Sequence, residues 1–426
     1  MTARRSPLIA IFPEASFGAA LNCVGIAQQL AKQGATPVFL THGGFHGVFA
    51  DYGFDEYRIP GEPDLTADET QSYWQDFLSH HLPHFNLPPQ EQLTTYVAPV
   101  WQAIVDGAMA VEAGLQSLLA RLKPDAVVID NVIMFPAIAN AGVPWVRVVS
   151  CAETELPDPC VPPYLSGLAS GADPAAFTAA YRAATAPSHM AYNTFRTDHG
   201  LPPLAEGLFM EPSPYLNLLL APDITRHTRA TPLDPGRYTC LDGCVRQEAP
   251  YTPPAFPRDT GPLVYVSFGS LGAMDTAFFG RLLEVFATLP ARFLVNVGAG
   301  IDSYSSVPDN VHLQDWFPQP SVVAQCELFI HHGGNNSFCE ALFHGVPSLI
   351  LPYCWDGHDN AARAAETGVG QALPRWDMTD AALARAITEL MGDSTMRDRL
   401  RANAAQMQKA DHVALAARRI LEVLPA

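Results

Sequence analysis

Lysine is nearly absent from this 426-residue chain, which contains only Lys32, Lys123 and Lys409. We therefore expect neither Schiff-base chemistry nor a lysine-bearing phosphate loop. A bound phosphate would have to be held by backbone N–H groups, hydroxyls, His or Arg. Positive charge is scarce overall, because 25 basic residues stand against 43 acidic ones and give a net charge of −18. This balance argues against nucleic acid or an anionic membrane as a partner.

Long apolar runs and a cysteine framework are also missing. No window of about 18 apolar residues occurs, so we expect no transmembrane helix and no stable membrane insertion. The apolar run at residues 8–12 is short and leads into Pro13 and Glu14, which is typical of a first strand rather than a signal peptide. The eight cysteines show no framework spacing, which favours free thiols in a reducing cytoplasm.

What the chain does contain is a β-α-β rhythm in two blocks. Strand-like runs alternate with helical ones, a pattern that favours parallel sheets with helices on both faces. In the first block the strand-like runs occur at residues 7–12, 36–40, 124–131 and 144–150. In the second block they begin at residues 263, 292, 310, 328 and 347. The sequence therefore predicts an α/β protein with two Rossmann-like domains that face a central cleft.

Composition divides the chain into four parts. Residues 1–220 form the predicted N-terminal domain, in which a helical, aromatic-rich insert spans about residues 68–122. Residues 221–260 are rich in proline and lack periodicity, so they are predicted to be an interdomain linker. Residues 261–408 form the predicted second domain, and residues 409–426 form an amphipathic terminal helix.

The stretch LFIHHGGNNSFCE, residues 328–340, combines more functional signals than any other. A short apolar strand leads into two glycines, and a helix is expected to begin near Asn336. The N–H groups and dipole of that helix would form an anion site that needs no lysine, and His332 could donate to a phosphate oxygen. Glu340 lies one turn further on, where a carboxylate could accept from ribose hydroxyls. The alternative is a glycine-rich turn with a buried histidine.

The surrounding block, residues 316–370, carries WFPQ, HHGGNNSFCE, GVP and PYCWDGHDNA in order. It resembles the nucleotide-sugar signature of the family 1 (UGT-like, bacterial macrolide-type) glycosyltransferases. The resemblance implies a GT-B fold, with the helix at 409–426 crossing back to the N-terminal domain. It implies an inverting, metal-independent, cytoplasmic enzyme, a monomer or homodimer. The enzyme would move a sugar from a UDP or TDP donor to a small acceptor. No cofactor is expected, because the nucleotide sugar is a co-substrate.

The resemblance also implies donor-binding roles for individual positions. Trp316 would stack on the nucleobase, Gln319 would lie near base or ribose, and Glu340 would bind the ribose. Asp356 would hold sugar hydroxyls, and Gly357 stands where the family usually has a glutamine that reads them. His358 or Asp359 is expected to compensate for the missing side chain. The residues expected to hold the diphosphate are Ser270, His332, Gly334, Asn336 and Ser337.

The first loop departs from the family at the position of its catalytic base. The family has a G-H-x-x-P loop whose His deprotonates the acceptor and is oriented by a buried Asp. Here Gly18-Ala19 stands at Gly-His, whereas the expected Asp is present as Asp130. Four alternatives stay open: Asp130 is the base; Glu14 or a histidine at 80, 81 or 84 replaces the His; the acceptor needs no strong base; or the protein is inactive.

The acceptor is expected to be apolar or aromatic, because the N-terminal domain is rich in large apolar side chains. Such side chains are more often core than pocket, and the sequence names no acceptor. Two other classes stay open: a GT-B relative such as an epimerase or lipid-linked transferase, and a homologue that only binds nucleotide sugar or uses an N-, C- or carboxylate acceptor. The residues predicted to line the acceptor pocket are Phe17, Trp74, Phe77, His81 and Met134.

Overall fold

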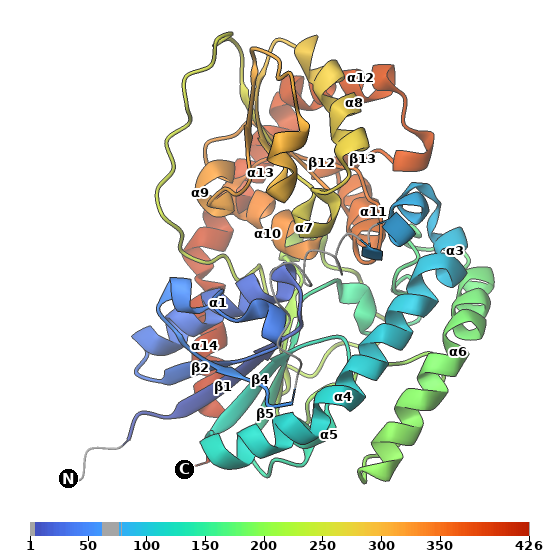
Figure 1. The fold of residues 1–426 in the computed structure, drawn as a ribbon, viewed down its shortest axis with the longest axis vertical. Helices are drawn as coiled ribbons and strands as arrows, with labels where there is room; N and C mark the ends of the chain where they lie inside the picture. The colour runs from blue at the N-terminus through green and yellow to red at the C-terminus, as the bar shows by residue number, and fades with distance from the viewer. Residues whose placement is uncertain (1–4, 62–75, 78, 426) are drawn as a thin grey trace.

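The computed structural model describes residues 5–61, 76–77 and 79–425. They form two lobes, each built on a parallel sheet (Figure 1). The first sheet has the order β3-β2-β1-β4-β5-β6-β7 and the second has the order β10-β9-β8-β11-β12-β13. The strands of the first sheet are β1 (Leu8–Pro13), β2 (Thr36–Thr41), β3 (Asp55–Arg58), β4 (Ala126–Asp130), β5 (Trp145–Val149), β6 (Leu216–Leu220) and β7 (Tyr238–Leu241). Those of the second are β8 (Leu263–Ser267), β9 (Arg292–Asn296), β10 (Val311–Gln314), β11 (Leu328–His331), β12 (Ser348–Ile350) and β13 (Gly370–Ala372).

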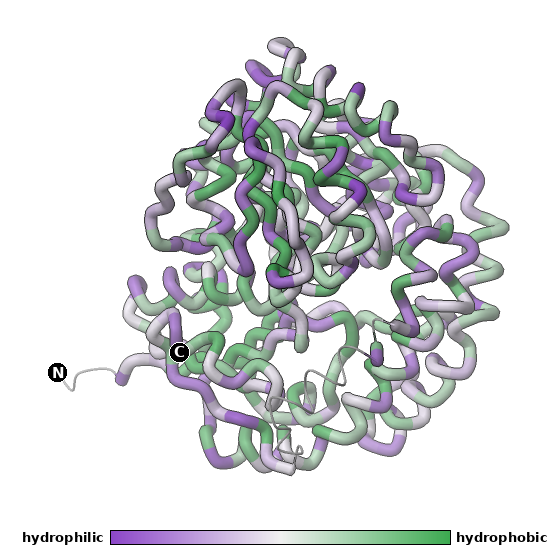
Figure 2. The backbone as a smooth tube through the Cα atoms, turned by 45° about the horizontal axis from the view of Figure 1, so that its top comes forward, coloured by the Kyte–Doolittle hydropathy of each residue, from purple (hydrophilic) through white to green (hydrophobic). Residues whose placement is uncertain are grey.

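The central strands are apolar along their whole length because helices cover both faces of each sheet. In Figure 2 the tube is mostly green through the interior of both lobes, whereas purple is concentrated at the outside. The N-terminal lobe has the helices α1 (Phe17–Lys32), α3 (Pro89–Gln92), α4 (Ala98–Leu122), α5 (Pro136–Ala139) and α6 (Ala175–Asp198). The remaining helices are α7 (Gly269–Gly272), α8 (Thr276–Ala287), α9 (Gln319–Val323), α10 (Asn335–His344), α11 (Gly357–Thr367), α12 (Asp380–Gly392), α13 (Ser394–Ala410) and α14 (His412–Glu422).

One helical segment, Pro89–Leu122, is long and apolar enough to qualify as a membrane span by length and composition. Its apolar run is interrupted by Pro99 and by scattered polar residues, so it contains no continuous apolar window. In the fold, one face of this segment packs into the core of the N-terminal lobe through Trp101, Val105 and Leu115. A core helix of this kind passes the same test as a membrane span.

The predicted linker at 221–260 starts too early. Within it, β7 pairs in parallel with β6, so the first sheet extends to Leu241. The prolines before β7 occupy the crossover between the two strands, where no ladder hydrogen bond is lost. The terminal helix α14 packs against α1, and Ala416, Ala417 and Ile420 enter the core beneath the first sheet. Figure 1 shows α14 in red beside the blue α1 of the lower lobe.

Candidate functional site

His332 sits in a pocket made by glycines. A Cβ atom on Gly334 would lie 2.5 Å from the Nε2 atom of His332, and one on Gly269 would lie 3.1 Å from its Cε1 atom. Gly333 has a φ of +93°, which an L side chain rarely adopts. The two loops that follow β8 and β11 thus converge on one imidazole, with Ser270 directly after Gly269. Burial lowers the pKa of His332 to about 4, although a hydrogen bond with the backbone of Ser267 partly offsets this, so the ring is neutral at pH 7 and carries a single N–H.

The N-terminus of α10 points into the same place. The helix begins at Asn335 with Gly334 as its cap, one residue earlier than predicted, and no side chain of its own caps it. The Oδ2 atom of Asp356 accepts from the N–H of Asn335 at 3.0 Å. The sugar-binding carboxylate predicted from the sequence therefore also caps the predicted phosphate helix. Asn336 and Ser337 lie in the first turn of α10, where backbone N–H groups lack partners within the helix.

Gly357 leaves no room for the glutamine that its position usually carries. A Cβ atom there would lie 2.5 Å from the carbonyl oxygen of His332. The two residues expected to compensate are engaged elsewhere. The Nε2 atom of His358 lies 3.3 Å from the Oε1 atom of Gln92, and the carboxylate of Asp359 accepts from Thr154, Leu165 and Gly167 of the N-terminal lobe. A sugar contact by His358 or Asp359 would require these partners to give way, so that role stays a prediction.

Glu340 is fully buried, and both of its carboxylate oxygens are paired. One accepts from Arg246 at 2.7 Å and the other from Gln319 at 2.7 Å, and Gln319 also donates to the Oγ atom of Ser337 at 3.1 Å. A direct ribose contact by Glu340 would require one of these partners to give way. Trp316, by contrast, is 52% exposed, so its ring is open to a nucleobase.

Hydrogen bonds connect Asp130 of the first lobe to the N-terminus of α10, a connection that the sequence did not reveal. Asp130 is 2% exposed and accepts from the Oγ atom of Ser150 at 2.6 Å. The carbonyl oxygen of Ser150 in turn accepts from the side-chain amide of Asn335 at 2.9 Å, as does the carbonyl of Leu220. Ser150 directly follows β5, and its place at the carboxyl end of a strand was the available signal.

Glu14 occupies the end of β1 next to Asp130. Its N–H donates to the carbonyl of Asp130 at 2.6 Å because β1 and β4 pair in register at Pro13 and Asp130. The side chain is only partly exposed; burial, together with the nearby Glu155, raises the pKa of Glu14 to about 7. Burial likewise raises the pKa of Asp130, which the hydrogen bond from Ser150 partly offsets. Ala19 lies in the first turn of α1 rather than in a loop, because α1 already begins at Phe17 after the Ser16 cap.

The residues predicted for the acceptor pocket do not gather in one place. Met134 is fully buried in the core. Its backbone N–H donates to the hydroxyl of Tyr192, and that hydroxyl donates to the carbonyl of Met134. Its predicted role at an open pocket is not supported. Phe17 is 45% exposed beside Phe45, whereas Phe77 packs against His81 with ring centroids 4.3 Å apart. Trp74 lies outside the described residues.

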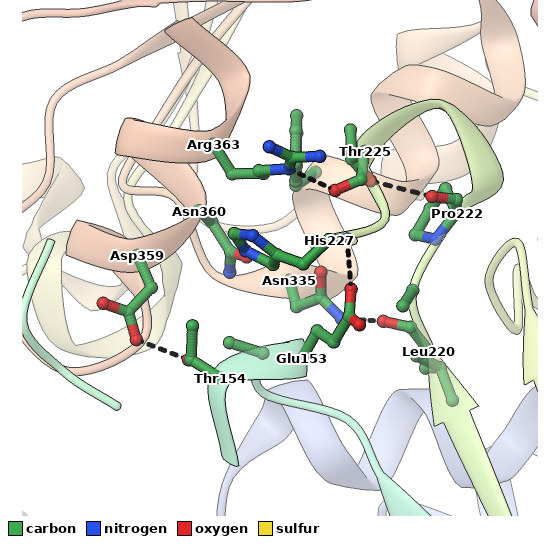
Figure 3. A pocket seen from close by; sticks show the side chains of 13 residues that line it. Glu153, Thr154, Leu220, Pro222, Thr225, His227, Asn335, Asp359, Asn360 and Arg363 are labelled. Atoms are coloured by element: carbon green, nitrogen blue, oxygen red, sulfur yellow. Dashed lines mark hydrogen bonds between the residues drawn. The ribbon is translucent and has the colours of Figure 1, made fainter. Parts of the chain in front are cut away.

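A seam of polar contacts joins the lobes around a small cavity of about 20 Å³, drawn in Figure 3. Arg363 donates to the carbonyls of Thr225 and Arg226, and the side-chain amide of Asn360 donates to the carbonyl of Cys151 at 3.2 Å. Such a cavity has room for little more than water. The larger cavity, about 570 Å³, lies between α1, residues 242–248 and α10. Neither cavity contains His332 or Asp130.

Comparisons with known proteins agree with this geometry. Residues 281–419 match the family model described as erythromycin biosynthesis protein CIII-like, C-terminal domain. The chain is 38% identical over 130 residues to erythronolide mycarosyltransferase from Saccharopolyspora erythraea, a match covering 30% of this chain and 31% of that protein. In general the chain spans between about a third and a half of the length of the curated relatives it matches.

Solved structures match over nearly the whole chain. The glycosyltransferase of kitacinnamycin superposes with a TM-score of 0.72 at 20% identity, covering 99% of this chain and 100% of that one. The spinosyn rhamnosyltransferase SpnG complexed with thymidine diphosphate gives a TM-score of 0.64 at 17% identity, covering 97% and 99%. At these identities the likeness establishes the fold.

The two facing parallel-sheet domains and the glycine-bounded histidine site define a protein of the GT-B class, as predicted. Within this fold, residues 281–419 are similar to the EryCIII-like C-terminal domain, and the curated relatives that match part of the chain are NDP-sugar glycosyltransferases such as erythronolide mycarosyltransferase.

Proposed function

We propose that this protein transfers a sugar from a TDP- or UDP-sugar to a small, largely apolar acceptor, with inversion and without a metal at the diphosphate. The observation that carries the proposal is the convergence of Gly269-Ser270, His332 and the α10 N-terminus on one point beside Asp356. A neutral imidazole N–H and a helix N-terminus can stabilise the negative charge that grows on the departing diphosphate. The solved relatives support a TDP donor, since one of them is a complex with thymidine diphosphate.

Glu14 is our choice for the base that replaces the missing histidine. Asp130 is less suitable, because it is almost fully buried and one of its oxygens is taken by Ser150 at 2.6 Å. Glu14 is more accessible, and a base with a pKa near the working pH is the most effective kind. In the proposed step, Glu14 takes the acceptor's O–H proton while the acceptor oxygen bonds to the sugar C1 atom. The bond from C1 to the phosphate oxygen breaks, and its electron pair leaves with the nucleoside diphosphate.

The test is release of nucleoside diphosphate from TDP- and UDP-sugars in the presence of a panel of phenols and macrocyclic alcohols. We expect turnover that falls about 10²-fold or more in His332→Ala, as when a transition-state donor is lost. Glu14→Gln should abolish turnover and leave TDP affinity unchanged. Full activity in Glu14→Gln, with loss in Asp130→Asn, would move the role of base to Asp130.

A second candidate is a homologue that binds nucleotide sugar without transferring it. The observation in its favour is Ala19, which stands where the family's base is expected. TDP binding measured by calorimetry, with no release of diphosphate from any donor and acceptor pair, would favour this candidate and contradict the enzymatic one.

A further inference from the structure

Three histidines that the proposed reaction does not use lie together on the aromatic insert. His80, His81 and His84 each offer a ring nitrogen, and these three atoms lie within 4.8 Å of one another. The ring centroids are 4.8 Å apart for His80 and His81, and about 6 Å apart for the other two pairs. His80 and His81 directly precede the short 3-10 helix Leu82–Asn86, and His84 lies within it.

The central histidine of the cluster has an unused polar atom. His81 is 7% exposed, and its Nδ1 atom is buried without a hydrogen-bond partner among the described residues. Its ring is enclosed by Phe77 and Tyr96, with centroids 4.3 and 5.2 Å away. A buried polar atom left without a partner destabilises the fold, and a ligand that binds it would remove this cost.

The donor set selects one class of ligand. Imidazole nitrogens bind Zn²⁺ and its neighbours Co²⁺, Ni²⁺ and Cu²⁺, whereas Mg²⁺ and Ca²⁺ prefer oxygen. On a tetrahedral Zn²⁺ with Zn–N bonds of about 2.0–2.1 Å, ligand nitrogens stand about 3.3 Å apart. The present spread of up to 4.8 Å must therefore close by about 1.5 Å. Side-chain rotation can provide this, because His80 is exposed and His84 is half-buried.

The cluster also lies next to the residues through which the insert contacts the second lobe. The carbonyl oxygen of His84 accepts from the amide of Gln92 at 3.1 Å, and the same amide donates to the carbonyl of Tyr353 in the second lobe at 2.8 Å. Phe85, the next residue, packs on Tyr353 with centroids 4.7 Å apart. An ion held here would stiffen the segment through which the insert contacts the second lobe.

We propose that His80, His81 and His84 form a binding site for a Zn²⁺-type transition metal ion, with a fourth position left to water. The ion is structural: it fastens the insert where the insert meets the second lobe, and it takes no part in the transfer at His332. The proposal is independent of the proposed sugar transfer, since it would hold for an inactive homologue as well.

The test is titration of the chelator-treated full-length protein with Co²⁺ and Zn²⁺. We expect one equivalent of Co²⁺ to give the visible absorption bands of a tetrahedral site, and one equivalent of Zn²⁺ to displace it. Zn²⁺ should also raise the melting temperature, as any ligand of the folded state does, whereas Mg²⁺ should not. His81→Phe keeps an aromatic ring between Phe77 and Tyr96 and should weaken Zn²⁺ binding at least tenfold.

His189→Gln is the matched control, because His189 lies on α6 and its ring nitrogen is already engaged by the carbonyl of Ala205 at 2.9 Å. This variant should bind Zn²⁺ as the wild type does. If His81→Phe does not fold by circular dichroism, the exposed His80→Gln and half-buried His84→Gln carry the same test. Absence of a one-equivalent site would overturn the proposal. So would equal affinity in the wild type and in the folded variants at 80, 81 and 84.

Discussion

Gly357 shows how one missing side chain shapes the donor region. The family resemblance marks this position as a departure, but gives no reason for it. The structure supplies one, because a Cβ atom at 357 would press on the carbonyl of His332, and one on Gly333 would meet the carbonyl of Gly357 at 2.6 Å. The loop that carries His332 therefore lies closer to α11 than a glutamine would permit. A side chain at position 357 therefore cannot contact the sugar in this protein.

Replacing Gly357 by alanine should therefore be costly. We expect Gly357→Ala to lower the free energy of unfolding by about 1–3 kcal/mol, since backbone must shift to admit the methyl group, and to weaken TDP binding. Urea unfolding and calorimetry measure the two effects. Gly392→Ala is the control, because a Cβ atom there has no neighbour within 4 Å. Equal stability of the two variants would show that the contact at 357 is not tight.

The role proposed for Glu14 predicts how the rate of transfer depends on pH. In the proposed reaction Glu14 must be ionised to accept a proton, and burial, together with the nearby Glu155, raises the pKa of Glu14 to about 7. The rate should therefore fall as the pH drops through about 7 and reach a plateau above it. Because Glu155, also with a pKa near 7, is coupled to Glu14, the midpoint belongs to the pair. A profile of kcat/KM that stays flat between pH 5.5 and 8.5 (about three pH units around this midpoint) would contradict the assignment.

At the scale of elements, the segment that follows β7 does more than join two domains. Arg246 on this segment pairs with Glu248 at 2.5 Å and with Glu340 of α10 at 2.7 Å, and all three side chains are buried. Glu248 also accepts from the hydroxyl of Tyr52 in the first lobe at 2.8 Å. The carboxylate predicted to bind ribose is thus tied through two charged residues to the other lobe.

Arg246→Met should leave Glu340 buried without its charge partner. Breaking a buried pair from one side costs about 3–5 kcal/mol, so we expect a loss of that order in the free energy of unfolding. Adding Glu340→Gln should recover part of the loss, because the unpaired charge is then removed. Arg385→Met serves as control, since Arg385 and Glu389 form an exposed pair that should be worth about 0–1 kcal/mol. If the two arginine variants lose stability equally, the buried network is not a stabilising one.

At the scale of the whole molecule, the lobes are held together by polar side chains of α10 and α11. Asn335 donates to two carbonyls of the first lobe, and Asp359 accepts from Thr154 and from two backbone N–H groups. Both residues belong to the same loops that carry His332 and Asp356. Separation of the lobes would therefore disturb the proposed donor site directly, and a donor bound there should favour the closed form.

The double variant Asn335→Ala/Asp359→Ala should open the molecule. Each residue gives up at least two buried interdomain hydrogen bonds, at about 1 kcal/mol per bond. We expect a larger radius of gyration in small-angle X-ray scattering and a partial return on addition of TDP. Glu389→Ala, on an exposed face of α12, should leave the scattering curve unchanged. A curve identical to the wild type for the double variant would show that other contacts hold the lobes.

Local chemistry and periodicity could be read directly from the chain. The two β-α-β blocks, the glycines around His332 and the strand-terminal Asp130 were all predictable, because sheet period, glycine freedom and strand ends depend on neighbouring residues. Boundaries were less predictable: β7 joins the first sheet only because β6 offers it an edge. The uses of Ser150, Arg246 and Asp359 depend on partners more than 90 residues away.

The sequence by itself therefore determined the fold class and the residues that are proposed to hold the diphosphate. Only the tertiary structure decided that Glu14, rather than Asp130, is the accessible carboxylate, that Glu340 is paired on both oxygens, and that Met134 is core. The reason is physical. Exposure and pairing are properties of the packed lobes, and two carboxylates at neighbouring strand ends look alike until the fold buries one of them more deeply than the other.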